Sequence, residues 1–205
     1  MKHNTRFLFL PFFCLLLLSC SNTANTGTTA TATNTQSVSS TPTTVKSPTS
    51  LPQPTPTFKH VYRGTDFSIG YPDDWTATPH IDSQEEDVEF AESVDQARVY
   101  ITSSHEESTP ETLIQYALST VSGFGSDYQV LPVPATTTIN GVIWNQKKVS
   151  AVSPTGDPVT LLVLATKQLH NPNRAIMIQC GAKNAFFADS EAKVFHPMLQ
   201  SFTFQ

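Results

Sequence analysis

Residues 58–205 predict an α+β domain built around an antiparallel β-sheet. Three observations lead to this class. Short segments alternate apolar and polar residues, as half-buried strands do. Turn sequences at 140–141, 154–157 and 171–173 join consecutive apolar segments, which indicates antiparallel hairpins. Two further segments, beginning near Pro110 and Asn184, repeat apolar residues at helical spacing.

The first half of the domain contains three predicted strands. Residues 67–71 (FSIGY) alternate in character and meet the turn Pro72-Asp73-Asp74, which precedes Trp75. Residues 88–90 and 98–102 have the same strand character, and acidic residues around 93–96 connect them.

The first helix is expected to start at Ser108-Thr109-Pro110-Glu111. Ser or Thr caps a helix, proline suits its first turn, and an acidic residue there complements the helix dipole. Gly123 and Gly125 are expected to end it. Its apolar face consists of Leu113, Ile114, Ala117, Leu118 and Val121.

A meander is predicted to follow this helix. Residues 128–139 are extended, and Pro132 and Pro134 restrict them to a sheet edge or an irregular stretch. Asn140-Gly141 then begins a hairpin that leads into strand 142–152. The continuous apolar run 159–165 is typical of a central strand buried on both faces.

The C-terminal part is predicted to hold one more strand and one more helix. Residues 175–180 are a strand with Ile176, Ile178 and Cys180 on one face. Asn184 is expected to cap the helix, and Pro197 is expected to kink it. The helix face consists of Phe187, Val194, Phe195, Met198 and Leu199.

The N-terminus has the pattern of a secretory leader. Lys2 and Arg6 precede an apolar run that is too short to cross a bilayer as a helix. The run ends in Leu17-Leu18-Ser19-Cys20, which resembles the lipobox of bacterial lipoproteins. The resemblance implies cleavage after residues 1–19, a lipoprotein signal peptide, and diacylglycerol on Cys20. An anchor with two or more acyl chains is stable, whereas one chain binds only marginally.

Residues 20–57 are predicted to be the lipidated cysteine followed by a disordered Thr/Ser/Pro-rich stalk. Ser21–Thr57 carries a single charge, Lys46, and few apolar side chains. Such a segment cannot bury enough surface to offset its ordering entropy. The chain is therefore expected on the extracytoplasmic face of a bacterial cell membrane, with its domain in 58–205.

The order of elements resembles the Mog1/PsbP-like fold. The residues that carry this resemblance are Phe67, Ile69, Tyr71-Pro72 and Trp75 at the start and Ser201-Phe202-Thr203-Phe204 at the end. It implies a sheet with helices on both faces, an α/β/α sandwich. The fold gives no function by itself, and no binding residue of the family matches a position here.

Charge and composition exclude some functions. The net charge is −5, and without the leader the chain has 10 basic and 17 acidic residues. A domain this acidic is not expected to bind nucleic acid, which needs clustered Lys and Arg. The acidic run lacks the pattern of a calcium loop, so a solvated face is expected, with a docking patch for a basic partner as the alternative. The run comprises Asp82, Glu85, Glu86, Asp87, Glu89, Glu92 and Asp95.

Other chemistry-bearing residues are expected to be structural. Cys180, the one cysteine besides Cys14 and Cys20, is expected in the core, so no disulfide forms within the domain. Trp75 and Trp144 are expected to anchor the core rather than line a ligand cleft. The domain's histidines are not spaced for metal binding; they are His60, His80, His105, His170 and His196.

These observations favour a membrane-tethered, non-catalytic binding or assembly module for an envelope protein, without cofactor or metal. Two alternatives remain. One is a lipoprotein that binds a small ligand or a cation. The other is a hydrolase whose site is assembled from distant residues, because no known catalytic motif occurs in the chain.

Overall fold

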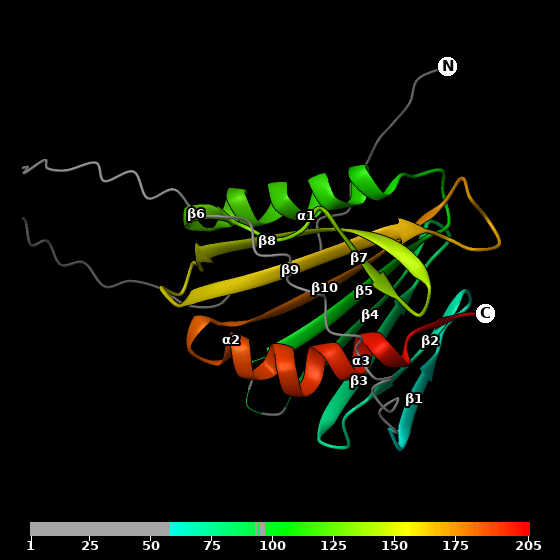
Figure 1. The fold of residues 1–205 in the computed structure, drawn as a ribbon, viewed down its shortest axis with the longest axis horizontal. Coiled ribbons are helices and arrows are strands. Elements are labelled where there is room, and N and C mark those ends of the chain that lie inside the picture. The colour runs from blue at the N-terminus through cyan, green and yellow to red at the C-terminus, as the bar shows by residue number, and fades with distance from the viewer. Residues whose placement is uncertain (1–57, 93, 95–96) are drawn as a thin grey trace, which may run out of the picture. The chain divides into compact units, whose positions relative to one another are not determined.

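The computed structural model describes residues 58–205 except 93, 95 and 96, and these residues form two β-sheets (Figure 1). Every strand pairing in the described residues is antiparallel, which confirms the main feature of the predicted fold class. The strand order of the larger sheet is β3 (Trp75–Ile81), β4 (Glu85–Glu92), β5 (Ala97–Ser104), β10 (Ala175–Lys183), β9 (Pro158–Lys167), β8 (Val142–Val152) and β6 (Ser126–Leu131), with β7 (Thr136–Ile139) paired to β8.

Two meanders make up the larger sheet. One is β3-β4-β5 and the other is the predicted β8-β9-β10. They meet where β5 pairs with β10, with Ile101 opposite Ile178. In the turn between β7 and β8, Asn140 and Gly141 have φ angles of 48° and 82°, the left-handed conformation that a tight two-residue hairpin requires.

The smaller sheet was not predicted from the sequence. Its order is β1 (His60–Arg63), β2 (Phe67–Tyr71) and β11 (Thr203–Phe204). The sequence indicated only β2, because β1 has four residues and β11 has two, too few to show a periodic pattern. The strand β3 after Trp75 was likewise missed.

The helix α1 (Pro110–Phe124) begins as predicted. Thr109 is its N-cap: the Thr109 hydroxyl accepts from the amide of Thr112 at 3.2 Å, and the Thr112 hydroxyl accepts from the amide of Thr109 at 3.0 Å. The prediction that Gly123 ends the helix was wrong, since Gly123 lies inside it and Gly125 is the C-cap. Its buried face packs with a cluster comprising Ile114, Ala117, Val163, Ala165 and Met177.

The residues of β9 and β10 that alternate with those facing α1 belong to the main core. Leu162 and Leu164 of β9 belong to it, whereas Val163 and Ala165 pack with α1, so β9 is buried on both faces as predicted. A continuous chain of ring contacts runs through this core and joins the two sheets; in order it contains Tyr71, Phe90, Tyr62, Phe67, Phe202, Trp144 and Phe204.

The C-terminal helical segment differs from its prediction in two details. It consists of α2 (Asn184–Ser190), a π-helical turn η1 (Glu191–Phe195) and α3 (His196–Ser201). Asn184 does not cap it; Lys183 is the N-cap, and Oδ1 of Asn184 accepts from the Thr160 hydroxyl at 2.7 Å. The wide turn η1 ends two residues before Pro197, and proline has no amide to donate to the preceding turn.

Several predictions concern residues outside the described part of the chain. They are the signal peptide 1–19, the lipid on Cys20 and the stalk 20–57. Within the described residues, no helix has both the length and the apolar character needed to span a bilayer.

Candidate functional site

Two residues of the acidic run, Glu86 and Asp87, are buried in the large sheet, which corrects the expectation of a solvated face at these positions. Glu86 and Asp87 of β4 are 0% and 4% exposed. Side chains along a strand alternate between the two faces of the sheet. Glu86 therefore shares the face of Val88 and Phe90, which belong to the main core, and Asp87 points to the opposite face.

Glu86 is held by hydrogen bonds from the smaller sheet. The Tyr62 hydroxyl donates to Oε1 at 2.9 Å, and the amide of Thr65 donates to Oε2 at 2.8 Å. Burial, followed by the bond to Glu86, raises the pKa of Tyr62. A side chain at Gly64 would meet both this carboxylate and the ring of Phe67, so Glu86 fills a closely packed structural position.

Asp87 belongs to a second group, which we call the carboxylate site: Glu85, Asp87, Tyr100 and Thr102. Thr102 of β5 lies directly opposite Asp87, and Tyr100 lies two residues along the same strand. The side chains of Thr102, Tyr100 and Glu85 lie close enough to Asp87 to lower its pKa. Its Oδ1 atom is nevertheless buried without a hydrogen-bond partner, which is rare in folded proteins.

The carboxylate site favours bound protons. Burial, and then the neighbouring charges of Asp87 and Asp82, raise the pKa of Glu85 to about 7. Burial also raises the pKa of Asp87, although the side chains of Thr102 and Tyr100 act in the opposite direction. Two carboxyl groups that repel each other in this way retain a proton near neutral pH or bind a cation.

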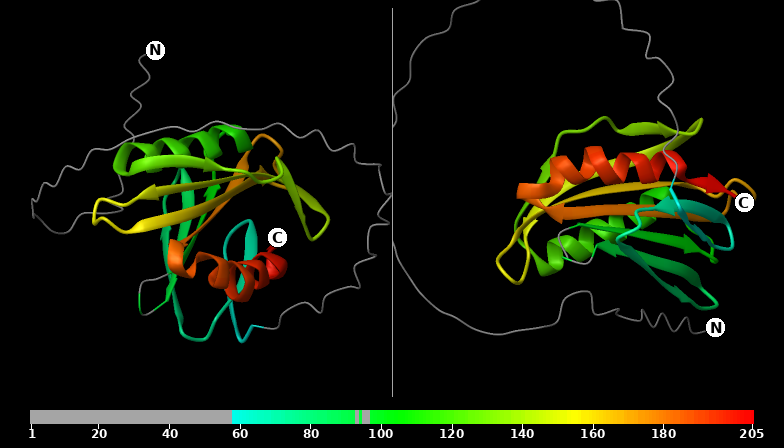
Figure 2. Two further views of the ribbon diagram at one scale, coloured as in Figure 1. Left: turned by 60° about the vertical axis from the view of Figure 1, so that its left-hand side comes forward. Right: turned by 90° about the horizontal axis from the view of Figure 1, so that it is seen from below.

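The surroundings of the site leave it partly open. The helix α1 packs on β8, β9 and β10, and it lies along one part of the large sheet in Figure 2. Its Tyr116 is 53% exposed and lies close enough to Glu85 and Asp87 for their charges to raise its pKa, after the larger effect of burial. Nearby, Arg98 and Glu89 form an ion pair of 2.7 Å.

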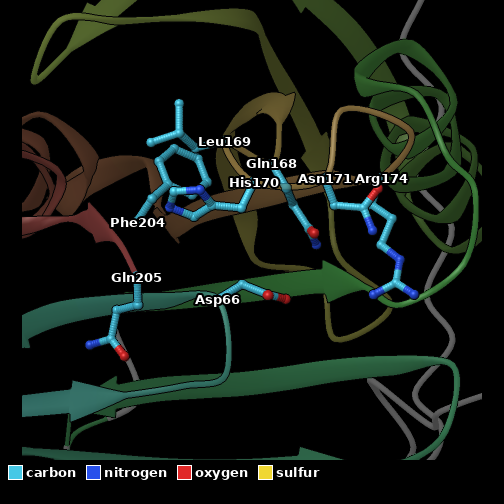
Figure 3. A pocket seen from close by; sticks show the side chains of 8 residues that line it. All are labelled: Asp66, Gln168, Leu169, His170, Asn171, Arg174, Phe204 and Gln205. Atoms are coloured by element: carbon cyan, nitrogen blue, oxygen red, sulfur yellow. The ribbon is translucent and has the colours of Figure 1, made fainter.

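A pocket of about 220 Å³ is the second candidate site (Figure 3). Its polar side chains are largely engaged in structural contacts: Asp66 accepts from the Ser103 hydroxyl at 2.9 Å, and Gln168 donates to that hydroxyl at 3.0 Å and to the Ser104 carbonyl at 2.9 Å. The lining residues are Asp66, Gln168, Leu169, His170, Asn171, Arg174, Phe204 and Gln205.

The hydrogen bonds of this pocket join the loop before β2 to β5 and to the β9–β10 turn. Among the described residues, the guanidinium of Arg174 has no hydrogen bond or ion pair, so it is the group there that could receive an anion. The carboxylate of Asp66 lines the same small pocket and would repel that anion. The carboxylate site is therefore the stronger candidate.

The remaining predicted site residues are structural. Trp75 is 6% exposed and Trp144 is 0% exposed, and both lie in the main core as expected. Cys180 is fully buried, and burial raises the pKa of its thiol. Sequence reasoning missed the carboxylate site, although the segment EEDVEFAE, in which Glu85 and Asp87 share one face of a strand, was a usable indication.

The structure does not bring the histidines together. His60 stacks on Tyr71 and lies 3.7 Å from Asp73, and His170 lines the pocket. His80 lies opposite Asp87 in the pairing of β3 with β4. In the part of the chain that the structure describes, no three His, Cys, Asp or Glu residues are arranged to hold a metal ion.

The arrangement of strands and helices defines an antiparallel α+β domain of the PsbP-like class. The cyanobacterial PsbP (CyanoP) of Synechocystis sp. PCC 6803 has a similar fold, with a TM-score of 0.53 and 12% sequence identity over 71% of this chain and 92% of that protein. This similarity confirms the PsbP-like fold predicted from the sequence.

A second solved structure is more distant. It is LpqN, a protein involved in cell envelope biogenesis of Mycobacterium tuberculosis, with a TM-score of 0.44 and 14% identity over 68% of this chain and 83% of that protein. No protein-family model matches the chain. No curated protein matches it either.

Proposed function

We propose that the chain is a bacterial lipoprotein whose PsbP-like domain is a non-catalytic binding module for an envelope protein, held at the extracytoplasmic face of the cell membrane. The observation that carries this proposal is the apolar leader ending in Leu17-Leu18-Ser19-Cys20. A diacylglycerol on Cys20 gives the multi-chain anchor that stable attachment needs. A tethered domain needs clearance from the headgroups, and the 37 residues of 21–57 would supply roughly 30–36 Å as a random coil.

The proposal includes the complete layer order of the fold, an α/β/α sandwich. Its support is the alternation along β9 and β10: Val163 and Met177 pack with α1, whereas Leu162 and Ile178 pack in the main core with residues of α2 and α3. Figure 1 draws α1 and the C-terminal helices apart from each other, with strands between them in that view.

The charge of the domain favours a protein partner over the lipid surface. Residues 58–205 carry 9 basic and 17 acidic side chains, so anionic headgroups repel the domain. One of these carboxyl groups, that of Asp87, has a buried oxygen without a hydrogen-bond partner.

Fractionation and partner capture test this function together. The full chain should sediment with membranes and resist washing with high salt, while Cys20→Ala should leave the membrane fraction. After cross-linking and detergent extraction, the anchored chain should recover one stoichiometric envelope protein. Recovery of no stoichiometric partner, with the chain at its native abundance, would contradict the binding role. Release of the wild-type chain by salt would contradict the anchor.

The alternative of a small-ligand or cation-binding lipoprotein is favoured by one observation, the unpartnered Oδ1 of Asp87. A free cation that stabilises the domain at micromolar concentration, with no protein partner captured, would support this alternative instead. Thermal unfolding with and without calcium chloride distinguishes the two.

A further inference from the structure

We propose that the pocket beside the β9–β10 turn binds a free amino acid with an apolar side chain, whose carboxylate pairs with Arg174 and whose ammonium group pairs with Asp66. This site goes beyond the proposed function, because neither the lipid anchor nor the protein partner enters the argument. The probes are free amino acids, so a failure of this inference is distinguishable from a failure of the anchor or of partner capture.

Two opposite charges line the pocket without pairing with each other. In the described residues, the guanidinium of Arg174 has no hydrogen bond or ion pair, and the carboxylate of Asp66 has one hydrogen bond and no ion pair. Arginine keeps its charge in proteins. Both residues are partly exposed, unlike the buried Oδ1 of Asp87, so a ligand in the pocket can reach them.

This combination of charges selects the kind of ligand. Asp66 repels a simple anion and Arg174 repels a simple cation, so a ligand with one charge loses at one residue what it gains at the other. Figure 3 draws the carboxylate of Asp66 and the guanidinium of Arg174 facing each other in that view, and a zwitterion satisfies both. The volume of about 220 Å³ is below the roughly 300–1,000 Å³ of sites for drug-sized molecules, which favours one amino acid.

The carboxylate of Asp66 is held in place by buried groups. Its Oδ2 accepts from the Ser103 hydroxyl at 2.9 Å, and that hydroxyl accepts from the side-chain amide of Gln168 at 3.0 Å. Ser103 is 0% exposed and Gln168 is 4% exposed. In the part of the chain that the structure describes, no donor reaches Oδ1 of Asp66. The fixed carboxylate therefore keeps one oxygen for an ammonium group, whose three donors need no planar partner.

The backbone that carries Arg174 is also fixed. The amide of Gln168 donates to the Arg174 carbonyl at 3.0 Å, and the amide of Arg174 donates to the Asn171 carbonyl at 2.9 Å. These two bonds close the β9–β10 turn, so the arginine reaches the pocket from a defined position, and a preorganised site loses less freedom on binding. A guanidinium presents paired donors that match the two oxygens of a carboxylate, so Arg174 receives that end of the ligand.

The apolar wall of the pocket accounts for the side chain of the ligand. Leu169 and Phe204 both line the pocket, and Leu169 is 62% exposed. The Phe204 ring stacks on Trp144 with 6.3 Å between centroids and meets Phe202 edge-on at 5.2 Å, so it forms a fixed surface. Figure 3 shows Leu169 and Phe204 on one side and Arg174 on the other. An apolar side chain of the ligand gains by covering this wall.

Isothermal titration calorimetry of the purified full chain in detergent, at neutral pH, tests the site with leucine. Leucinamide lacks the carboxylate, N-acetyl-leucine lacks the ammonium group, glycine lacks the apolar side chain, and inorganic phosphate is a simple anion. We expect leucine to bind at least about tenfold more tightly than leucinamide or N-acetyl-leucine, because each analogue loses a charge-assisted hydrogen bond. Glycine and phosphate should also bind more weakly than leucine.

Two variants connect the binding to the named residues. Arg174→Gln should bind leucine at least about tenfold more weakly and lose the preference for leucine over leucinamide. Asp66→Asn should lose the preference for leucine over N-acetyl-leucine, while its amide oxygen can still accept from Ser103. Two matched controls should bind leucine as the wild type does: Arg63→Gln, at an exposed arginine of β1, and Asp189→Asn, at a carboxylate that is 68% exposed in α2.

Thermal unfolding shows whether each variant folds. If Asp66→Asn does not fold, Arg174→Gln decides, because in the described residues that guanidinium makes no hydrogen bond that the substitution removes. Four results would overturn the assignment: no saturable binding of leucine at millimolar concentrations, equal affinities for leucine and any of its analogues, unchanged binding in Arg174→Gln, or tighter binding of phosphate than of leucine.

Discussion

Glu86 and Asp87 are adjacent residues of β4 with buried carboxyl groups, yet they point to opposite faces of the sheet, and only Asp87 has an oxygen without a hydrogen-bond partner. Glu86 receives its bonds from Tyr62 and Thr65 of the smaller sheet. The two carboxylates therefore have different roles. Glu86 ties the smaller sheet to the larger one, whereas Asp87 keeps one buried oxygen without a hydrogen-bond partner.

Replacing Glu86 with alanine should destabilise the domain strongly. The change leaves the Tyr62 hydroxyl and the Thr65 amide without their acceptor and opens a cavity beside Phe67, so the free energy of unfolding should fall by about 2–4 kcal/mol. Urea unfolding measures the change. Glu107→Ala, an exposed carboxylate, is the matched control, and a loss below about 0.5 kcal/mol in Glu86→Ala would refute the structural role.

The stability of the domain should decrease as the pH rises from about 5 to 8. The pKa of Glu85 is raised from 4.5 to about 7, and that of Asp87 is also raised. Between the unfolded and folded pKa values, the folded chain holds more protons than the unfolded chain, so the free energy of unfolding falls with increasing pH. Because Glu85 is only partly buried, solvent screening reduces the expected loss to about 1 kcal/mol.

Urea unfolding at pH 5.5, 6.5 and 8 measures this dependence. Glu85→Gln should be less pH-dependent than wild type and more stable at pH 8, since it cannot ionise. Asp189→Asn reports the pH dependence contributed by all other groups. The same slope in Glu85→Gln and wild type would show that the carboxylate site does not titrate in this range.

Local sequence patterns predicted the elements whose partners are close in the chain. Thr109 caps α1, and Asn140-Gly141 turns β7 into β8, because both depend on neighbouring residues alone. The short strands β1 and β11 could not be predicted in this way. Both strands are stabilised by pairing with β2. In the pairing of β11 with β2, Thr203 lies opposite Ser68, although most of the domain's sequence separates the two residues.

The carboxylate site could not be predicted from the sequence, because it also depends on pairing between strands. Asp87 lies opposite Thr102 only because β4 and β5 pair in one particular register. A shift of one residue would turn Asp87 toward the main core and Glu86 away from it. Composition suggested a solvated acidic segment, but the pairing of β4 with β3 and β5 places Glu86 and Asp87 inside the sheet, where both are buried.

The side chain of Asn140 should stabilise the domain in addition to forming its turn. Its side-chain amide donates to the carbonyls of Gln200 and Phe202 at 3.0 and 2.7 Å, which links the hairpin to the C-terminal segment. Asn140→Asp keeps a residue that tolerates the left-handed backbone but removes both donors, so we expect a loss of about 2 kcal/mol in urea unfolding. Asn173→Asp, in the β9–β10 turn, is the control; equal effects of the two changes would argue against the link.

The thiol of Cys180 should be unreactive in the folded chain. It is fully buried, and burial raises its pKa, so almost no thiolate is present at neutral pH. In the proposed mature form, Cys180 is the single unmodified cysteine. A colorimetric disulfide reagent should detect one thiol per chain in urea and almost none within an hour under native conditions. Rapid modification of the native chain would contradict the buried position.

The most direct measurement for the proposed anchor is intact mass spectrometry of the chain extracted from its native membrane, followed by sequencing of the N-terminal peptide. The account predicts a chain that begins at Cys20 and carries the mass of a diacylglycerol on its sulfur. A free thiol at Cys20, or a chain that retains residues 1–19, would contradict the account.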